Sequence, residues 1–202
     1  MSWIKTIPFA AATGRLKTLY DRVKGPDDNV DNIMMAHSLR PHTMEGHMAL
    51  YKYVLHHTGN TLEKSFLELI GTWVSMLNTC HYCVEHHYAG MCRLLGDGEL
   101  GATYRAALDA KDIQSAVFDT RQHAALAYAQ KLTLSPSELT EQDITLLRDA
   151  GFSDGEILEL NQVTSYFSYA NRTVLGLGVS TDGDVLGLSP GNSDNPNDWN
   201  HT

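Results

Sequence analysis

Apolar residues recur at helical spacing along almost the whole chain. In the first such segment, Leu16, Leu19, Tyr20 and Val23 fall on one stripe of a helix. No segment alternates apolar and polar residues in the manner of a half-buried strand. The pattern therefore predicts an all-α fold, with helices over residues 10–23, 30–39, 44–56, 61–77, 80–95, 99–110, 119–132, 140–150 and 153–177, and a short helical piece near Ile113.

Polar residues mark several of the predicted helix ends. Thr140 and Ser153 each precede an apolar-periodic segment, and an acidic residue, Asp143 or Glu156, stands three positions further on. This spacing predicts an N-cap at Thr140 and a capping box at Ser153. Residues 77–79 are the natural place for a break between the two central helices.

The composition changes near the end of the chain. Residues 180–202 are rich in Gly, Asp, Asn, Ser and Pro and hold too few apolar residues to form a core of their own. We therefore predict an all-helical domain over residues 1–179 and a C-terminal tail or arm over residues 180–202. The tail is expected to be disordered or to lie extended on a neighbour, with Trp199 as the one residue able to anchor it.

Composition and charge argue against some classes of binding partner. Of the 202 residues, 43% are hydrophobic and 19% charged, as in ordinary globular proteins, and the net charge is −9 with no basic cluster. This argues against nucleic acid and anionic membranes as partners. No apolar run has the length of a transmembrane helix, and the first residues do not resemble a signal peptide. Only three cysteines are present, which favours a reducing, cytoplasmic location.

The chemistry of the chain is concentrated in one Cys-x-x-Cys pair, Cys80 and Cys83. Such a pair can cycle between dithiol and disulfide or hold a metal. On a helical wheel Cys80, Cys83 and His87 share a stripe, so His87 can act as a base that helps to form the reactive Cys83 thiolate. An N-cap at Asn78 or Thr79 would place Cys80 in the first turn, where the positive helix end lowers a thiol pKa.

Glu68 precedes Cys80 by twelve residues and lies in an apolar series. Along one continuous helix the two would be roughly 18 Å apart. A bend at residues 77–79 would allow Glu68 to return towards Cys80 and accept protons there.

Other uses of these residues remain open at this point. A zinc site would take Cys80, Cys83 and His87 or His86, with a fourth ligand from elsewhere, and the pair could also be inert. His81 is expected to face solvent, and Cys92, on the other side of the helix, to be a small buried hydrophobe. The available fourth zinc ligands are His47, His56 and His57.

The spacing of Glu68, Cys80, Cys83 and His87 resembles the signature of the AhpD-like alkylhydroperoxidases, in the carboxymuconolactone decarboxylase superfamily. Residues 146–154, 166–172 and 177–179 are similar to the branch called peroxidase-related proteins. The likeness covers roughly residues 10–179. It implies an AhpD-like helical bundle with the CxxC at the start of a central helix, assembled as a homo-oligomer, commonly a dimer, trimer or hexamer.

The activity implied by this resemblance is the reduction of organic hydroperoxides without metal or flavin. Cys83 would be peroxidatic and Cys80 resolving, with His87 activating Cys83 and Glu68 carrying protons around Cys80. A thioredoxin-like or lipoyl dithiol would reduce the resulting disulfide.

Tyr82 stands where the best-studied members of the family have a histidine, so the proton relay is expected to be altered. Tyrosine donates hydrogen bonds but is a poor base near neutral pH. Two other functions stay open: a decarboxylase- or lactonase-like enzyme of the superfamily, and a non-enzymatic redox sensor or metal-binding protein. Four residues of the last helix are expected to line a pocket or subunit contact, or only to pack: Tyr166, Tyr169, Asn171 and Arg172.

Overall fold

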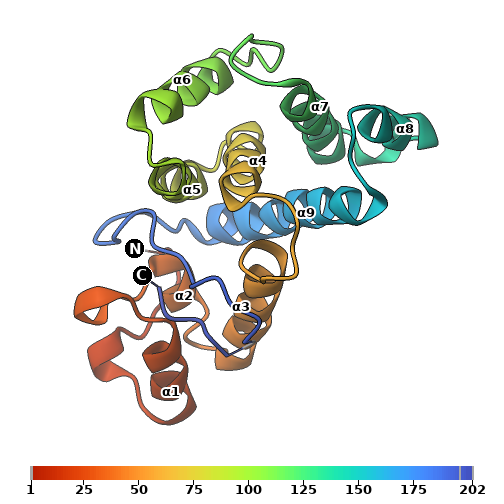
Figure 1. Ribbon diagram of the computed structural model, residues 1–202. Helices are drawn as coiled ribbons and strands as arrows, with labels where there is room; N and C mark the ends of the chain where they lie inside the picture. Colours follow the sequence, from red (N-terminus) through yellow and green to blue (C-terminus); the bar gives the residue numbers. More distant parts are fainter. Residues whose placement is uncertain (1, 196, 202) are drawn as a thin grey trace.

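The computed structural model describes residues 2–195 and 197–201, and its regular structure is helical (Figure 1). No β-strand occurs in these two ranges, where the one β-type pairing is an isolated bridge between Pro190 and His201. The all-α prediction is therefore confirmed. The helices are α1 (Gly14–Val23), α2 (Asn32–Ala36), α3 (Pro41–Leu55), α4 (Lys64–Leu77), α5 (His81–Leu95), α6 (Gly98–Asp109), α7 (Thr120–Leu134), α8 (Glu141–Asp149) and α9 (Asp154–Leu177).

The predicted helix starts at α8 and α9 are confirmed in detail. Thr140 and Ser153 each form a capping box, with Asp143 and Glu156 respectively reaching back to the cap backbone. The short helix expected near Ile113 is wrong: residues 110–118 form turns, and Lys111 adopts a left-handed backbone (φ 57°) that ends helical geometry.

Helix α4 forms the centre of the core, between α5, α7 and α9 (Figure 1). Its residues from Leu67 to Ser75 are all buried, and the Trp73 indole donates a hydrogen bond to the Leu126 carbonyl at 3.2 Å. At Gly71 the α4 backbone approaches α9 so closely that an added Cβ would lie 2.2 Å from the Phe167 ring. No helix of the described residues is both long and apolar enough to cross a membrane.

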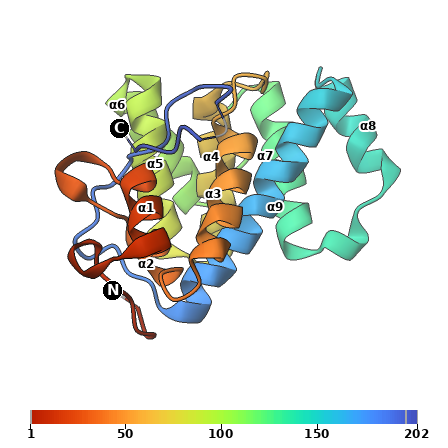
Figure 2. The same ribbon diagram turned by 90° about the horizontal axis from the view of Figure 1, so that it is seen from below.

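The described residues after α9, 179–195 and 197–201, which we call the C-terminal arm, lie on their own chain against α1, α3 and α5 (Figures 1 and 2). Trp199 is buried, and the Arg22 guanidinium lies 3.7 Å from its ring centroid. The fully buried ammonium of Lys52 donates to the Ser193 hydroxyl at 3.0 Å. The arm is thus held by specific side chains, including the predicted anchor Trp199.

The contact between α4 and α9 gives a stability test. Gly71→Ala should lower the free energy of unfolding by about 1–3 kcal/mol, because the new methyl group must displace the Phe167 ring. Urea unfolding measures the change. Gly46→Ala in α3 is the matched control, since a Cβ there meets no atom within 4 Å and alanine favours the helix. Equal stability of the two variants would contradict this packing.

Candidate active site

The bend between α4 and α5 brings Glu68 to the motif helix. Thr79 has a left-handed backbone (φ 58°), and α4 and α5 pack against one another on either side of it. The break predicted at residues 77–79 is therefore present. The buried Glu68 carboxylate is hydrogen-bonded to His87 Nδ1 at 2.6 Å, so its observed partner is His87, one turn beyond Cys83.

The cap of α5 differs from the prediction. Neither Asn78 nor Thr79 is the N-cap: Cys80 itself occupies that position, and the helix begins at His81. The left-handed conformation of Thr79 turns the chain one residue later than the polar side chains suggested. Both sulfurs of the pair are free and buried, so the pair is a dithiol at the start of the helix.

The two thiols share a hydrogen bond, and their environments differ. The hydrogen bond from the Cys83 side chain, together with the Cys83 backbone N–H, lowers the pKa of Cys80 despite its burial. The same hydrogen bond and burial raise the pKa of Cys83 well above its usual value. The pair therefore favours a single negative charge, held at the helix N-terminus on Cys80.

A small cavity of about 40 Å³ lies beside the motif, and Cys83, Glu68 and His87 line it. Cys80 does not line it, so the accessible sulfur of the pair is Cys83. The Tyr51 and Tyr166 rings stack over one another in the cavity wall, with centroids 5.5 Å apart. Neither phenol hydroxyl is hydrogen-bonded to another residue in the described ranges, so both are available to a ligand. Burial raises the pKa of both tyrosines well above 10, which keeps them protonated donors.

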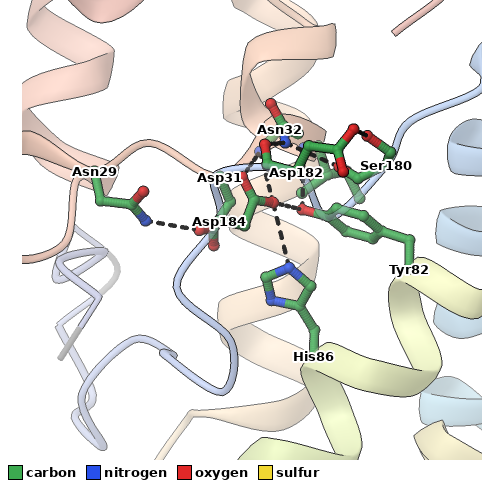
Figure 3. Close-up of polar contacts among 9 residues, drawn as sticks. Asn29, Asp31, Asn32, Tyr82, His86, Ser180, Asp182 and Asp184 are labelled. Atoms are coloured by element: carbon green, nitrogen blue, oxygen red, sulfur yellow. Dashed lines mark hydrogen bonds and ion pairs between the residues drawn. The ribbon is translucent and has the colours of Figure 1, made fainter. Parts of the chain in front are cut away.

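The Tyr82 side chain points towards Asp184 of the C-terminal arm (Figure 3). Its hydroxyl donates to the Asp184 carboxylate at 2.8 Å and accepts from the Ile33 backbone N–H at 3.2 Å. Burial, followed by the charges of Asp31 and Asp184, raises the Tyr82 pKa well above its usual value. Tyr82 is thus a hydrogen-bond donor at neutral pH, and position 82, directly before Cys83, holds no base.

Asn171 of α9 is a site residue whose role the sequence did not reveal. It is fully buried, donates to the Ser75 hydroxyl at 3.0 Å and accepts from the Asn78 amide at 3.0 Å. Its side chain also bonds to the Cys83 sulfur and favours the thiolate there. An amide among the apolar positions of α9 was the available signal.

The remaining candidates occupy varied positions. His81 is exposed, as predicted. The prediction that Cys92 is buried is wrong: Cys92 is half-buried, with its sulfur packed against Gly101 of α6. His86 is buried beside Asp184, whereas Tyr169 and Arg172 lie at the surface. Within residues 2–195 and 197–201, no group of three or more His, Cys, Asp or Glu side chains is arranged to hold a metal ion.

The fold is similar to that of solved peroxidase-related proteins. One from Ralstonia eutropha JMP134, described as an alkylhydroperoxidase AhpD core, superposes with a TM-score of 0.74 at 23% identity, over 89% of this chain and 91% of its own. An uncharacterized peroxidase-related protein from Silicibacter sp. TM1040 matches with the same TM-score and coverage at 26% identity. These neighbours confirm the resemblance to AhpD-like, peroxidase-related proteins.

A debrominase solved with 2,3,4-tribromopyrrole shares the fold at 15% identity, with a TM-score of 0.62 over 82% of both chains. The same architecture therefore carries more than one chemistry, and the reaction has to be argued from the site. No protein-family model and no curated protein matches the sequence.

His47, which lines the cavity, gives a pH test. Burial, followed by the charges of His37 and His201, lowers the pKa of His47 from 6.5 to about 3. Between these values the unfolded chain binds a proton that the folded chain does not. The free energy of unfolding therefore falls as the pH drops from about 6.5 towards 3. His47→Gln should reduce this slope by up to about one proton, measured by urea unfolding at several pH values.

His81→Gln is the control for that measurement, because His81 is exposed and its replacement should leave the slope unchanged. Parallel stability curves for the His47 variant and the unmodified protein would show that His47 is not held neutral by the fold. The comparison uses slopes, so a loss of stability at all pH values does not obscure it.

Proposed function

We propose that this protein is a CxxC-dependent thiol peroxidase that reduces hydroperoxides through Cys83 and Cys80. The observation that carries the proposal is a buried, hydrogen-bonded dithiol of which one sulfur, Cys83, faces a small cavity lined by proton donors. The AhpD-like fold and its peroxidase-related neighbours support it.

In the first step the Cys83 sulfur attacks the terminal oxygen of the hydroperoxide. The Cys83 proton passes along the shared hydrogen bond to the Cys80 thiolate. Cys83, the accessible sulfur, thereby becomes the nucleophile, although Cys80 has the lower pKa. The O–O bond breaks, Cys83 becomes a sulfenic acid, and the remaining oxygen leaves as an alkoxide or hydroxide. The Asn171 amide stabilises the developing charge on Cys83.

Protons for the leaving oxygen come from the cavity wall. Glu68 and His87 share a 2.6 Å hydrogen bond, and both line the cavity. In its acid form, a carboxylate beside an imidazolium, the pair gives one proton to the leaving oxygen and keeps a carboxylate and a neutral imidazole. That proton converts the alkoxide to an alcohol, or the hydroxide to water. The Tyr51 and Tyr166 hydroxyls are placed to donate hydrogen bonds to the peroxide oxygens.

The second step closes the disulfide. The Cys80 sulfur displaces the sulfenic hydroxyl of Cys83, which leaves as water. Two electrons from a dithiol donor, of the thioredoxin-like or lipoyl kind, then restore both thiols through a mixed disulfide. The donor's two thiols become a disulfide in the exchange, so the two electrons that reduce the peroxide come from the donor.

Substitution of single cysteines tests this assignment. Cys83→Ser should abolish peroxide consumption with a dithiol donor, because the nucleophile is lost. Cys80→Ser should leave a Cys83 sulfenic acid, because the resolving thiol is lost, and dimedone labelling with mass spectrometry detects it. Cys92→Ser, which changes the third cysteine and leaves the pair intact, is the matched control and should turn over normally.

Full turnover by Cys83→Ser would refute the assigned roles. A redox sensor would lose two thiols once per chain but would not consume excess peroxide with a dithiol. A carboxymuconolactone decarboxylase-like enzyme would be insensitive to both cysteine substitutions.

A further inference from the structure

The C-terminal arm completes the wall of the peroxide cavity. Gly187, Leu188, Ser189 and His201 of the arm line it, opposite Cys83. Ser189 is fixed by the Arg93 guanidinium of α5, which donates to its hydroxyl at 2.7 Å. The docked arm therefore supplies one wall of the cavity.

Asp184 fastens the start of the arm to the helices around the motif (Figure 3). Its carboxylate, almost fully buried, accepts from Tyr82 at 2.8 Å and from the Asn32 backbone N–H at 3.0 Å, and lies 3.3 Å from His86 Nε2. The Asn32 amide in turn donates to the Ser180 and Asp182 carbonyls. Because a buried carboxylate that loses its partners is costly, these contacts hold the arm in one position.

Gly187 sets how closely the arm approaches α5. Its backbone is left-handed (φ +82°), and a Cβ there would lie 2.9 Å from the Ala89 carbonyl carbon and 3.0 Å from the Gly90 nitrogen. Both of those atoms belong to backbone that cannot swing aside. Any side chain at Gly187 must therefore lift the arm away from α5, the helix that carries Cys83 and His87.

We infer that the docked arm is the specificity element of the site and restricts its substrates to hydrogen peroxide and the shortest alkyl hydroperoxides. The inference rests on the proposed function. A cavity of about 40 Å³ compares with roughly 10–15 Å³ for one water on the same scale, so it admits a molecule of a few heavy atoms. An aryl hydroperoxide such as cumene hydroperoxide cannot bring its O–O bond to Cys83 while the arm is in place.

The test is Gly187→Ala, with Gly183→Ala as the matched control. Both glycines lie in the arm with a left-handed backbone, but a Cβ at Gly183 meets no atom within 4 Å. The kcat/KM values for hydrogen peroxide and cumene hydroperoxide, with dithiothreitol as donor, give a preference ratio. Gly187→Ala should shift that ratio towards cumene hydroperoxide by about tenfold or more, a difference of the size that pocket fit supplies. Gly183→Ala should leave it unchanged.

Asp184→Asn supplies a second route to a loosened arm if Gly187→Ala does not fold, and it should shift the ratio in the same direction. An unmodified protein that reduces both peroxides equally well would overturn the inference. So would a folded Gly187→Ala variant with an unaltered ratio.

Thiol labelling separates this inference from the proposed function, because it needs no turnover. Modification of Cys83 by iodoacetamide and by fluorescein maleimide is followed by mass spectrometry in the same variants. Faster labelling by the bulky reagent, relative to the small one, in Gly187→Ala and Asp184→Asn but not in Gly183→Ala supports the arm as the size barrier even if no peroxide is consumed. Peroxide turnover with unchanged relative labelling would retain the peroxidase and reject the barrier.

Discussion

The left-handed turn at Thr79 is the constraint on which the site depends. It costs of the order of 1–3 kcal/mol for a residue with a side chain, and the tight packing of α4 against α5 offsets that cost. Because the chain reverses there, Glu68 meets His87 instead of lying a long helix away from the motif. The same turn makes Cys80 the N-cap of α5 and sets it beside Cys83, whose side chain and backbone N–H lower the pKa of Cys80 by hydrogen bonding. One backbone conformation thus positions both the Glu68–His87 pair and the two cysteines.

In the Cys-x-x-Cys motif, the sulfur with the lower pKa and the sulfur that faces the cavity are different atoms. Cys80 has the lower pKa but does not line the cavity, whereas Cys83 lines the cavity and has a raised pKa. Their hydrogen bond reconciles the two, since a proton that moves from Cys83 to Cys80 transfers the charge to the accessible atom. An isolated buried thiol at the position of Cys83 would have no such route. The pair is therefore a functional unit even before any disulfide forms.

The features that could be predicted from the sequence are those set by residues close together along the chain. Helical periodicity located the main helices, and the spacing of Thr140 with Asp143 and of Ser153 with Glu156 located two helix starts. The N-cap of α5 was misplaced because the backbone of Thr79, not its polar side chain, ends the turn. The roles of Asn171, Tyr51 and Asp184 in the site arise from helices or segments distant in sequence, and no spacing along the chain encodes such contacts. The arm was recognised by composition, but its docking depends on long-range partners such as Lys52 and Arg22.

The presence of tyrosine at position 82 is explained by the arm. A histidine at position 82 could move protons, but Tyr82 has a raised pKa and uses its hydroxyl to bind Asp184. Position 82 therefore fastens the cover of the cavity, and in the proposed mechanism the Glu68–His87 pair is the proton carrier. The cover keeps water away from the hydrogen bonds around Cys83, and hydrogen bonds are stronger where water is excluded. In the proposed peroxidase cycle, the arm or the α4–α5 turn would have to move before the disulfide is reduced, because the same cover stands between the thiols and a protein dithiol.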